Sequence, residues 1–200
     1  MKKDFTDLLR KADDLKQRGK LYKAIALYEE ILSAIDDNEL LEWLRITLAD
    51  LYFWVKEFDK AKNLVMDNIN QNPQEAFNYY FMGFLLIGEG KFCEAKEYFN
   101  MACEIEPENP EYLRGLGLVE FLLDNFDTAE NILREVLKRD PENSAARDNL
   151  IELLIRIGKV EEAEKEISEF RRKDPKDWQI LYRVQELRNK KEEIKKGGSS

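Results

Sequence analysis

The stretch AFNYYFMGFLLIGEGKFCEAKEYFNMACEIEPEN, from Ala76 to Asn109, decides the fold of this chain. Apolar residues recur at helical spacing on both sides of the short segment Gly88-Glu89-Gly90. Glycine accepts left-handed backbone angles and so ends a helix, whereas a proline such as Pro107 cannot continue one. The stretch therefore predicts two helices joined by a tight turn and followed by a second turn at the proline.

The marks of this stretch recur along the chain at a constant step. An alanine recurs at this step in the second to fifth units, and the alanine of the first unit lies slightly further from the next one. These alanines are Ala24, Ala61, Ala95, Ala129 and Ala163. Prolines keep the same step: Pro73, Pro107, Pro141 and Pro175. We interpret each alanine as the place where two helices of a pair cross closely, since a larger side chain would push them apart. The constant step predicts a chain of stacked helix pairs.

This pattern resembles the tetratricopeptide repeat, a helix–turn–helix unit of about 34 residues with glycine, alanine and proline at fixed places. The resemblance extends over residues 5–38, 42–75, 76–109, 110–143 and 144–177, with a capping helix over residues 177–196. It implies an all-α fold, a right-handed α–α superhelix (a tetratricopeptide solenoid) of about eleven helices in one domain over residues 1–196. Residues 197–200 are interpreted as a flexible tail.

Three residues depart from the family's pattern. Glu120 stands where the family usually has an apolar residue, and Asn68 replaces a small apolar one. Asp36 replaces the first unit's proline, and the segment Asp36 to Glu39 is expected to form a loop that caps the next helix, not a calcium site. A lengthened helix or an altered loop is expected there.

The last predicted helix closes the stack. A terminal helix must cover the last apolar face and show a polar face to water. Its apolar side is predicted to consist of Trp178, Leu181, Tyr182, Val184 and Leu187. A docking arm is the alternative.

Composition narrows the class of protein. The chain has 200 residues, of which 44% are hydrophobic and 36% charged, which is too apolar for disorder and too charged for membrane insertion. Its formal net charge of −9 argues against nucleic acid as a partner. No apolar signal-peptide run follows the first residues, so a cytoplasmic location is expected.

Residues for catalysis and for cofactors are scarce. The chain has no histidine, which removes imidazole chemistry and histidine metal sites. The segment Gly88 to Phe92 lacks the spacing of a phosphate-binding loop. Cys93 and Cys103 lie ten residues apart on one predicted helix, about 15 Å, and are interpreted as reduced, buried apolar residues. We expect no catalytic residue, cofactor or metal, and an enzyme is the least favoured class.

The family resemblance implies that the first helices of successive repeats line a groove. Residues at the family's groove positions form an aromatic centre with charged ends. We predict as partner-binding residues Trp43, Asp50, Phe53, Trp54, Phe77, Tyr80, Phe81, Phe84, Arg114 and Phe121. The clamp by which one branch of the family holds chaperone carboxylates is absent, because the matching positions are Leu9, Asp13, Thr47, Phe77 and Phe81.

Two functions remain open for these aromatic residues. The first is a protein-interaction scaffold, adaptor or chaperone-like assembly factor that holds an apolar segment with flanking basic residues. The second is self-association through the same face, as a homodimer. If the rings line a groove, replacing Tyr80 and Phe84 with alanine weakens binding and leaves folding cooperative, whereas a sharp fall in melting temperature identifies them as core.

Overall fold

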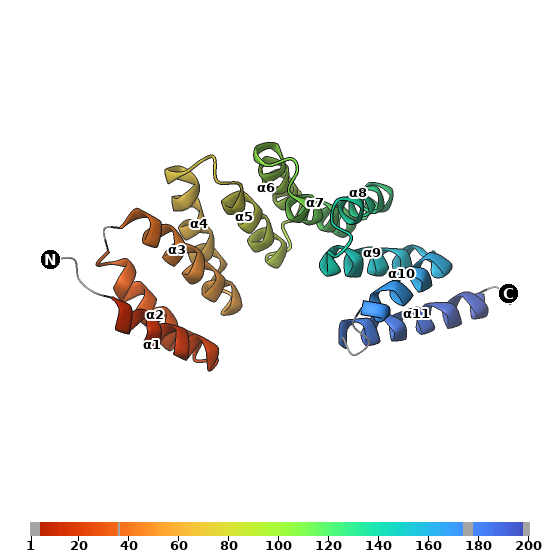
Figure 1. The fold of residues 1–200 in the computed structure, drawn as a ribbon, viewed down its shortest axis with the longest axis horizontal. Coiled ribbons are helices and arrows are strands. Elements are labelled where there is room, and N and C mark those ends of the chain that lie inside the picture. The colour runs from red at the N-terminus through yellow and green to blue at the C-terminus, as the bar shows by residue number, and fades with distance from the viewer. Residues whose placement is uncertain (1–4, 36, 174–177, 198–200) are drawn as a thin grey trace. The chain divides into compact units, whose positions relative to one another are not determined.

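A computed structural model describes residues 5–35, 37–173 and 178–197 (Figure 1). Eleven helices and no strands lie within these residues, so the predicted all-α helical-repeat class is confirmed. The helices are α1 (Thr6–Gln17), α2 (Leu21–Leu32), α3 (Asn38–Trp54), α4 (Phe58–Gln71), α5 (Ala76–Gly88), α6 (Phe92–Ile105), α7 (Pro110–Leu122), α8 (Phe126–Arg139), α9 (Ser144–Ile157), α10 (Val160–Lys173) and α11 (Trp178–Gly197).

Each odd-numbered helix from α1 to α9 packs against the helix that follows it (Figure 1). The chain forms two compact units: an N-terminal unit that ends at Ile105 and contains α1–α6, and a C-terminal unit that starts at Glu106 and contains α7–α11. Each unit has its own buried apolar residues.

A left-handed residue stands in the turn inside each helix pair. Gly19, Gly90 and Gly158 have φ angles of +70°, +77° and +82°, as glycines at a helix end were expected to. Lys56 and Asp124 occupy the equivalent turns with φ of 64° and 59°. The same turn therefore forms in all five pairs, although two of them lack glycine.

The helix pairs cross where small residues stand. All five predicted alanines are fully buried: Ala24, Ala61, Ala95, Ala129 and Ala163. Gly83 and Gly117 form a second set of close contacts, because a Cβ on Gly83 would lie 2.8 Å from the Phe99 ring and one on Gly117 would lie 3.0 Å from Leu133. A large side chain on the second helix thus fits against bare backbone on the first.

Gly83→Ala is expected to lower the free energy of unfolding by about 1–3 kcal/mol, even though alanine is the better helix former. The reason is that Phe99 is fully buried and cannot move away from the added methyl group. Chemical denaturation measures the change. In a Phe99→Val background the same substitution should cost little, because valine stands at the equivalent position, Val65, of the second pair. Equal costs in both backgrounds would contradict this explanation.

The departures from the repeat pattern have local explanations. Asn68 is buried, accepts a hydrogen bond from Arg45 at 3.1 Å and donates one to the Glu42 carbonyl at 3.1 Å. Glu120 is buried and accepts from the Asn125 amide at 2.8 Å. The expected lengthened helix is α3, and the Asp37 side chain caps it by accepting from the Leu40 N–H at 3.2 Å. Asp36 lies outside the described residues.

The last helix, α11, packs against α9 and α10 as a capping helix does, but with a different side from the one predicted. Ile180 and Leu187 are buried, whereas Trp178 and Tyr182 are 72% and 57% exposed. Leu181 is exposed as well. The prediction of the apolar side was wrong for these three residues, because the buried Arg183 turns its own side of α11 toward its carboxylate partners Asp148 and Glu152 on α9. Pro175 and residues 198–200 lie outside the described part of the chain.

Candidate peptide-binding surface

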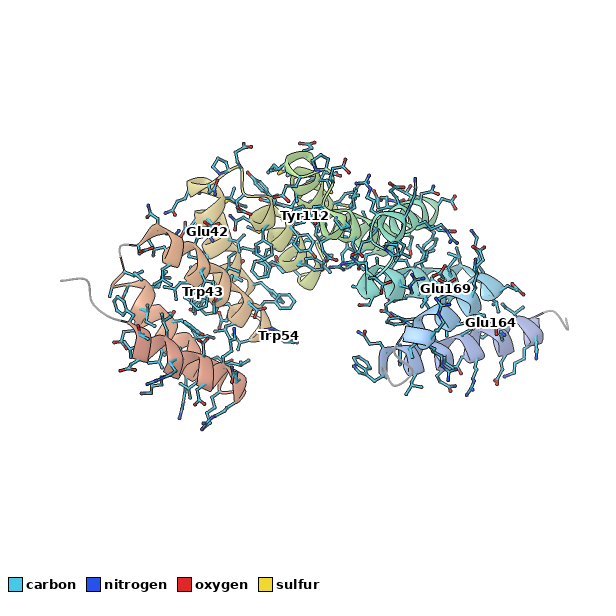
Figure 2. The ribbon with its side chains drawn as sticks, viewed as in Figure 1. Glu42, Trp43, Trp54, Tyr112, Glu164 and Glu169 are labelled. Carbon is cyan, nitrogen blue, oxygen red and sulfur yellow. The ribbon has the colours of Figure 1, made fainter. Side chains whose placement is uncertain are left out.

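The longest helix of the N-terminal unit, α3, presents a row of side chains at intervals of three and four residues. The row consists of Trp43, Thr47, Asp50 and Trp54, which this spacing places on one side of the helix. Trp43 is 44% exposed and its ring meets the edge of Tyr28 at 6.2 Å. Trp54 is 66% exposed at the C-terminal end of the helix (Figure 2). Two large indole rings therefore stand at the surface of one helix.

The first helix of the next pair, α5, carries a continuous row of contacting aromatic rings. Phe77 and Phe81 stack with centroids 6.0 Å apart, and Phe77 also contacts Tyr80 at 6.2 Å. Tyr80 meets Phe84 edge-on at 4.8 Å. Phe77 is 39% exposed, and the other three rings are half-buried. This row of rings thus has an outer end at Phe77 and an inner end at Phe84.

Phe53 links these two helices. Its ring lies against the backbone of Gly88 at the end of α5, so closely that a Cβ there would be 2.3 Å away. The same ring meets Trp54 at 6.0 Å and Phe58 at 5.7 Å. Phe53 is therefore a half-buried support between α3, α4 and α5. We call the set Trp43, Phe53, Trp54, Phe77, Tyr80, Phe81 and Phe84 the aromatic surface.

One carboxylate stands among these rings. Asp50 is half-buried, one helical turn before Trp54, and among the described residues its carboxylate has no ion pair or hydrogen bond. A carboxylate in this position attracts a cation brought by a ligand, and the neighbouring indole face attracts the same cation. The predicted Asp50 therefore lies beside the aromatic residues with which it was grouped.

The other two predicted binding residues, Arg114 and Phe121, lie on α7 of the C-terminal unit. The Arg114 Nε donates to Glu111 at 2.9 Å. Phe121 is only 7% exposed and belongs to the core of that unit, where it contacts Phe126. Neither residue is part of the aromatic surface as defined here.

The described residues offer little other site chemistry. They contain no group of three or more cysteine or acidic residues placed to hold a metal ion. None of the helices in these ranges is both long and apolar enough to cross a membrane. Cys93 and Cys103 both lie on α6 as free thiols. The expectation that both are buried was wrong for Cys93, which is exposed.

An ion-pair cluster around the buried Glu130 in the C-terminal unit joins α8 to the start of α10. Glu130 accepts hydrogen bonds from Arg134 at 2.9 Å and from Lys159 at 2.8 Å. Burial by itself would raise the pKa of this carboxyl, but the hydrogen bonds from Lys159 and Arg134 outweigh it and hold the pKa below its ordinary value of 4.5. Glu130 therefore stabilises the folded unit in its charged form.

Glu130→Gln is expected to lower the free energy of unfolding by about 1–2 kcal/mol at neutral pH. Because the folded pKa is lowered, the contribution of the carboxylate is present above the ordinary pKa and is lost as the pH falls through the folded pKa. The wild type and the variant should therefore converge as the pH falls below 4.5 and through the lowered folded pKa. Urea denaturation at a series of pH values measures the difference, and a gap that stays constant down to low pH would refute this account of Glu130.

Helix pairs that repeat at a constant step, with a left-handed turn inside each pair and small residues at each crossing, define a helical-repeat protein. The chain belongs to the tetratricopeptide repeat family: two models described as tetratricopeptide repeat match residues 85–144 and 120–185. Proteins of this family are generally non-enzymatic scaffolds for protein–protein interaction.

Among curated relatives, BBSome complex member BBS4 from Bos taurus is 31% identical over 142 residues, which cover 68% of this chain and 27% of the bovine protein. The chain thus spans about a quarter of that relative. The crystal structure of TTC0263, a tetratricopeptide repeat protein from Thermus thermophilus, has a TM-score of 0.75 at 20% identity and covers 92% of this chain and 99% of that one.

A further solved structure contains a peptide. The first repeat domain of Spaghetti (RPAP3), bound to the HSP90 peptide SRMEEVD, has a TM-score of 0.53 at 17% identity and covers 58% of this chain and 93% of that one. Similarity at this identity concerns the fold.

Proposed function

We propose that the aromatic surface of the N-terminal unit binds an apolar segment of another protein, extended or helical, and that the chain acts as an adaptor or chaperone-like assembly factor. The observation that carries the proposal is the exposure of Trp43, Trp54 and Phe77 on two neighbouring first helices. Exposed aromatic residues in such a group are typical anchors of protein interfaces. We further propose a cytoplasmic location, because Cys93 and Cys103 are free thiols.

Charge gives the proposed ligand a second property. Asp50 lies half-buried between Trp43 and Trp54 on the same side of α3. A lysine or arginine beside the apolar anchors of the partner would meet this carboxylate and the indole of Trp54 together. We therefore propose a basic residue next to the apolar ones in the partner segment.

A peptide like the HSP90 peptide bound by Spaghetti is not the ligand that we propose. That peptide, SRMEEVD, is acidic. The clamp positions of this chain hold Asp13, whose carboxylate accepts from the Tyr28 hydroxyl, and the stacked rings of Phe77 and Phe81. Asp13 repels a carboxylate, and the phenylalanine rings offer it no hydrogen-bond donor. These side chains favour the apolar, basic segment described above.

Selection of peptides from a random library displayed on phage, with the full chain immobilised, tests the proposal. Enriched peptides should combine bulky apolar residues with lysine or arginine. Trp54→Ala with Phe77→Ala should weaken a selected peptide by about tenfold or more, because both rings are anchors. Trp178→Ala with Tyr182→Ala is the matched control, since these two aromatic residues of α11 are more exposed than Trp54 and Phe77, and it should leave the affinity unchanged. Equal loss in both variants would reject the surface.

Self-association through the same exposed rings is the second candidate. Light scattering over a range of concentrations separates the two: a dimer that disappears in the Trp54→Ala, Phe77→Ala variant favours self-association. A monomer at the highest concentration leaves only the heterologous partner.

A further inference from the structure

A groove of about 460 Å³ runs between the last two helices, α10 and α11, in the C-terminal unit. Its floor is apolar and consists of Ile167 from α10 and of Val184 and Leu187 from α11. Leu181, which is exposed, extends this floor by one turn, because it lies three residues before Val184 on the same side of α11. The groove therefore offers an apolar strip that one helix could cover.

The edges of this groove are basic. Lys165 and Arg171 of α10 and Arg188 of α11 line it, and none of the three has an ion pair or a side-chain hydrogen bond within the described residues. The remaining cation, Lys191, is held by Glu164. Three cations without a counter-charge thus surround an apolar floor in a chain whose net charge is −9.

The equivalent place one repeat earlier, between α8 and α9, indicates which kind of structural element this groove accepts. Glu130 and Arg134 of α8 stand one repeat before Glu164 and Ser168. They are paired with Lys159 and Glu162, at the beginning of α10. The side of α8 that corresponds to the groove edge is therefore joined by ion pairs to the start of a helix, the second helix of the next pair.

The groove differs from that internal contact in one respect. Leu150 and Leu154 of α9 are fully buried under α10, whereas the equivalent residues of α11 are Val184 and Arg188. A ligand helix with a purely apolar face, placed in the groove as α10 is placed on α9, would leave Arg188 desolvated and unpaired, at a cost in free energy. A helix that carries carboxylates beside its apolar residues would pair with Arg188 and Arg171 instead.

We propose that the α10–α11 groove is a second docking site, which binds an amphipathic helix of another protein with acidic residues flanking its apolar face. This site is independent of the aromatic surface and prefers the opposite ligand charge. Failure of one site therefore leaves the other untouched.

Two synthetic peptides of roughly 18 residues test the proposal. Both carry leucine at helical intervals on an alanine background, and their flanking positions hold glutamate in one peptide and lysine in the other. Fluorescence anisotropy with the full chain should give an affinity for the glutamate peptide at least about tenfold tighter, with a strong dependence on salt. Arg171→Glu with Arg188→Glu should reverse the order of the two peptides.

The matched control is Lys11→Glu with Lys23→Glu, which makes the same change in net charge at exposed positions of the N-terminal unit. It should leave the preference intact. Equal binding of both peptides, no binding up to about 1 mM, or the same loss in control and reversal variants would overturn the proposal. A concentration-dependent dimer that only the groove reversal abolishes would also overturn it, since the occupant would then be a second copy of the chain.

Discussion

Arg183→Leu is expected to lower the free energy of unfolding of the C-terminal unit by about 3 kcal/mol, because it leaves three half-buried carboxylates without their buried cation. The Arg183 guanidinium makes two parallel bonds to Asp148, at 2.8 and 2.9 Å, and bonds to Glu152 at 2.6 Å and Glu186 at 2.7 Å. Its side chain is only 10% exposed, and that of Asp148 is 15% exposed.

These contacts hold α11 against α9. Burial would lower the pKa of Arg183, but the bonds to Asp148 and Glu186 outweigh burial and raise it, so the arginine stays charged at every accessible pH. Leucine supplies similar apolar volume but no charge, and Asp148 then faces Glu152 and Glu186 alone. Loss of the cation therefore turns an attraction into a repulsion.

Urea denaturation, together with hydrogen exchange of the α11 amides, measures this effect. The amides of α11 should lose most of their protection in Arg183→Leu, since the helix no longer docks. Arg188→Leu on the same helix serves as the control, because Arg188 is exposed and should change stability by less than about 0.5 kcal/mol. A loss in Arg183→Leu no larger than that of the control would show that packing of Ile180 and Leu187 alone holds the helix.

The second large effect is expected for Tyr80→Ala with Phe84→Ala, at about 3–5 kcal/mol for the pair. Both rings meet the fully buried Phe99 edge-on, Tyr80 at 5.8 Å and Phe84 at 5.3 Å. Their removal opens a cavity against Phe99 and ends two aromatic contacts. From the sequence this pair was expected to leave folding cooperative and to weaken binding only. Its contacts with Phe99 instead predict a loss of stability, which by the criterion given above makes both rings the core-supported, inner part of the aromatic surface.

Thermal unfolding of the pair variant checks this expectation, with Trp54→Ala plus Phe77→Ala as the comparison. The comparison variant should lose less than the pair variant, about 1 kcal/mol, because Trp54 and Phe77 are 66% and 39% exposed and neither ring meets Phe99. An unchanged melting temperature for Tyr80→Ala with Phe84→Ala would mean that Phe99 is held by other contacts.

The constant step of the repeats in the sequence was sufficient to predict the fold. Alanines and prolines at a constant step predicted the helix pairs, the crossings and the turns at Pro73, Pro107 and Pro141. The left-handed turns at Lys56 and Asp124 could not be read from residue type, because neither is a glycine. Only their place in the period, one repeat before the glycine turns at Gly90 and Gly158, indicates them.

The exposure of individual aromatic residues was not predictable in the same way. The equivalent groove positions Phe53 and Phe121, two repeats apart, are half-buried and buried, respectively. The difference depends on the neighbouring helices, and a single period carries no information about them. Likewise, the wrong apolar side of α11 follows from Arg183, whose carboxylate partners come from α9, 31 and 35 residues earlier.

The most direct test of the central claim is affinity capture from the lysate of the source cell, with quantitative mass spectrometry of the retained proteins. Wild type, the Trp54→Ala, Phe77→Ala variant and the Trp178→Ala, Tyr182→Ala variant are compared side by side. We predict a protein that is retained by wild type and by the α11 variant but is lost with the first variant. Equal retention on all three, or loss with the α11 variant alone, would contradict binding at the aromatic surface.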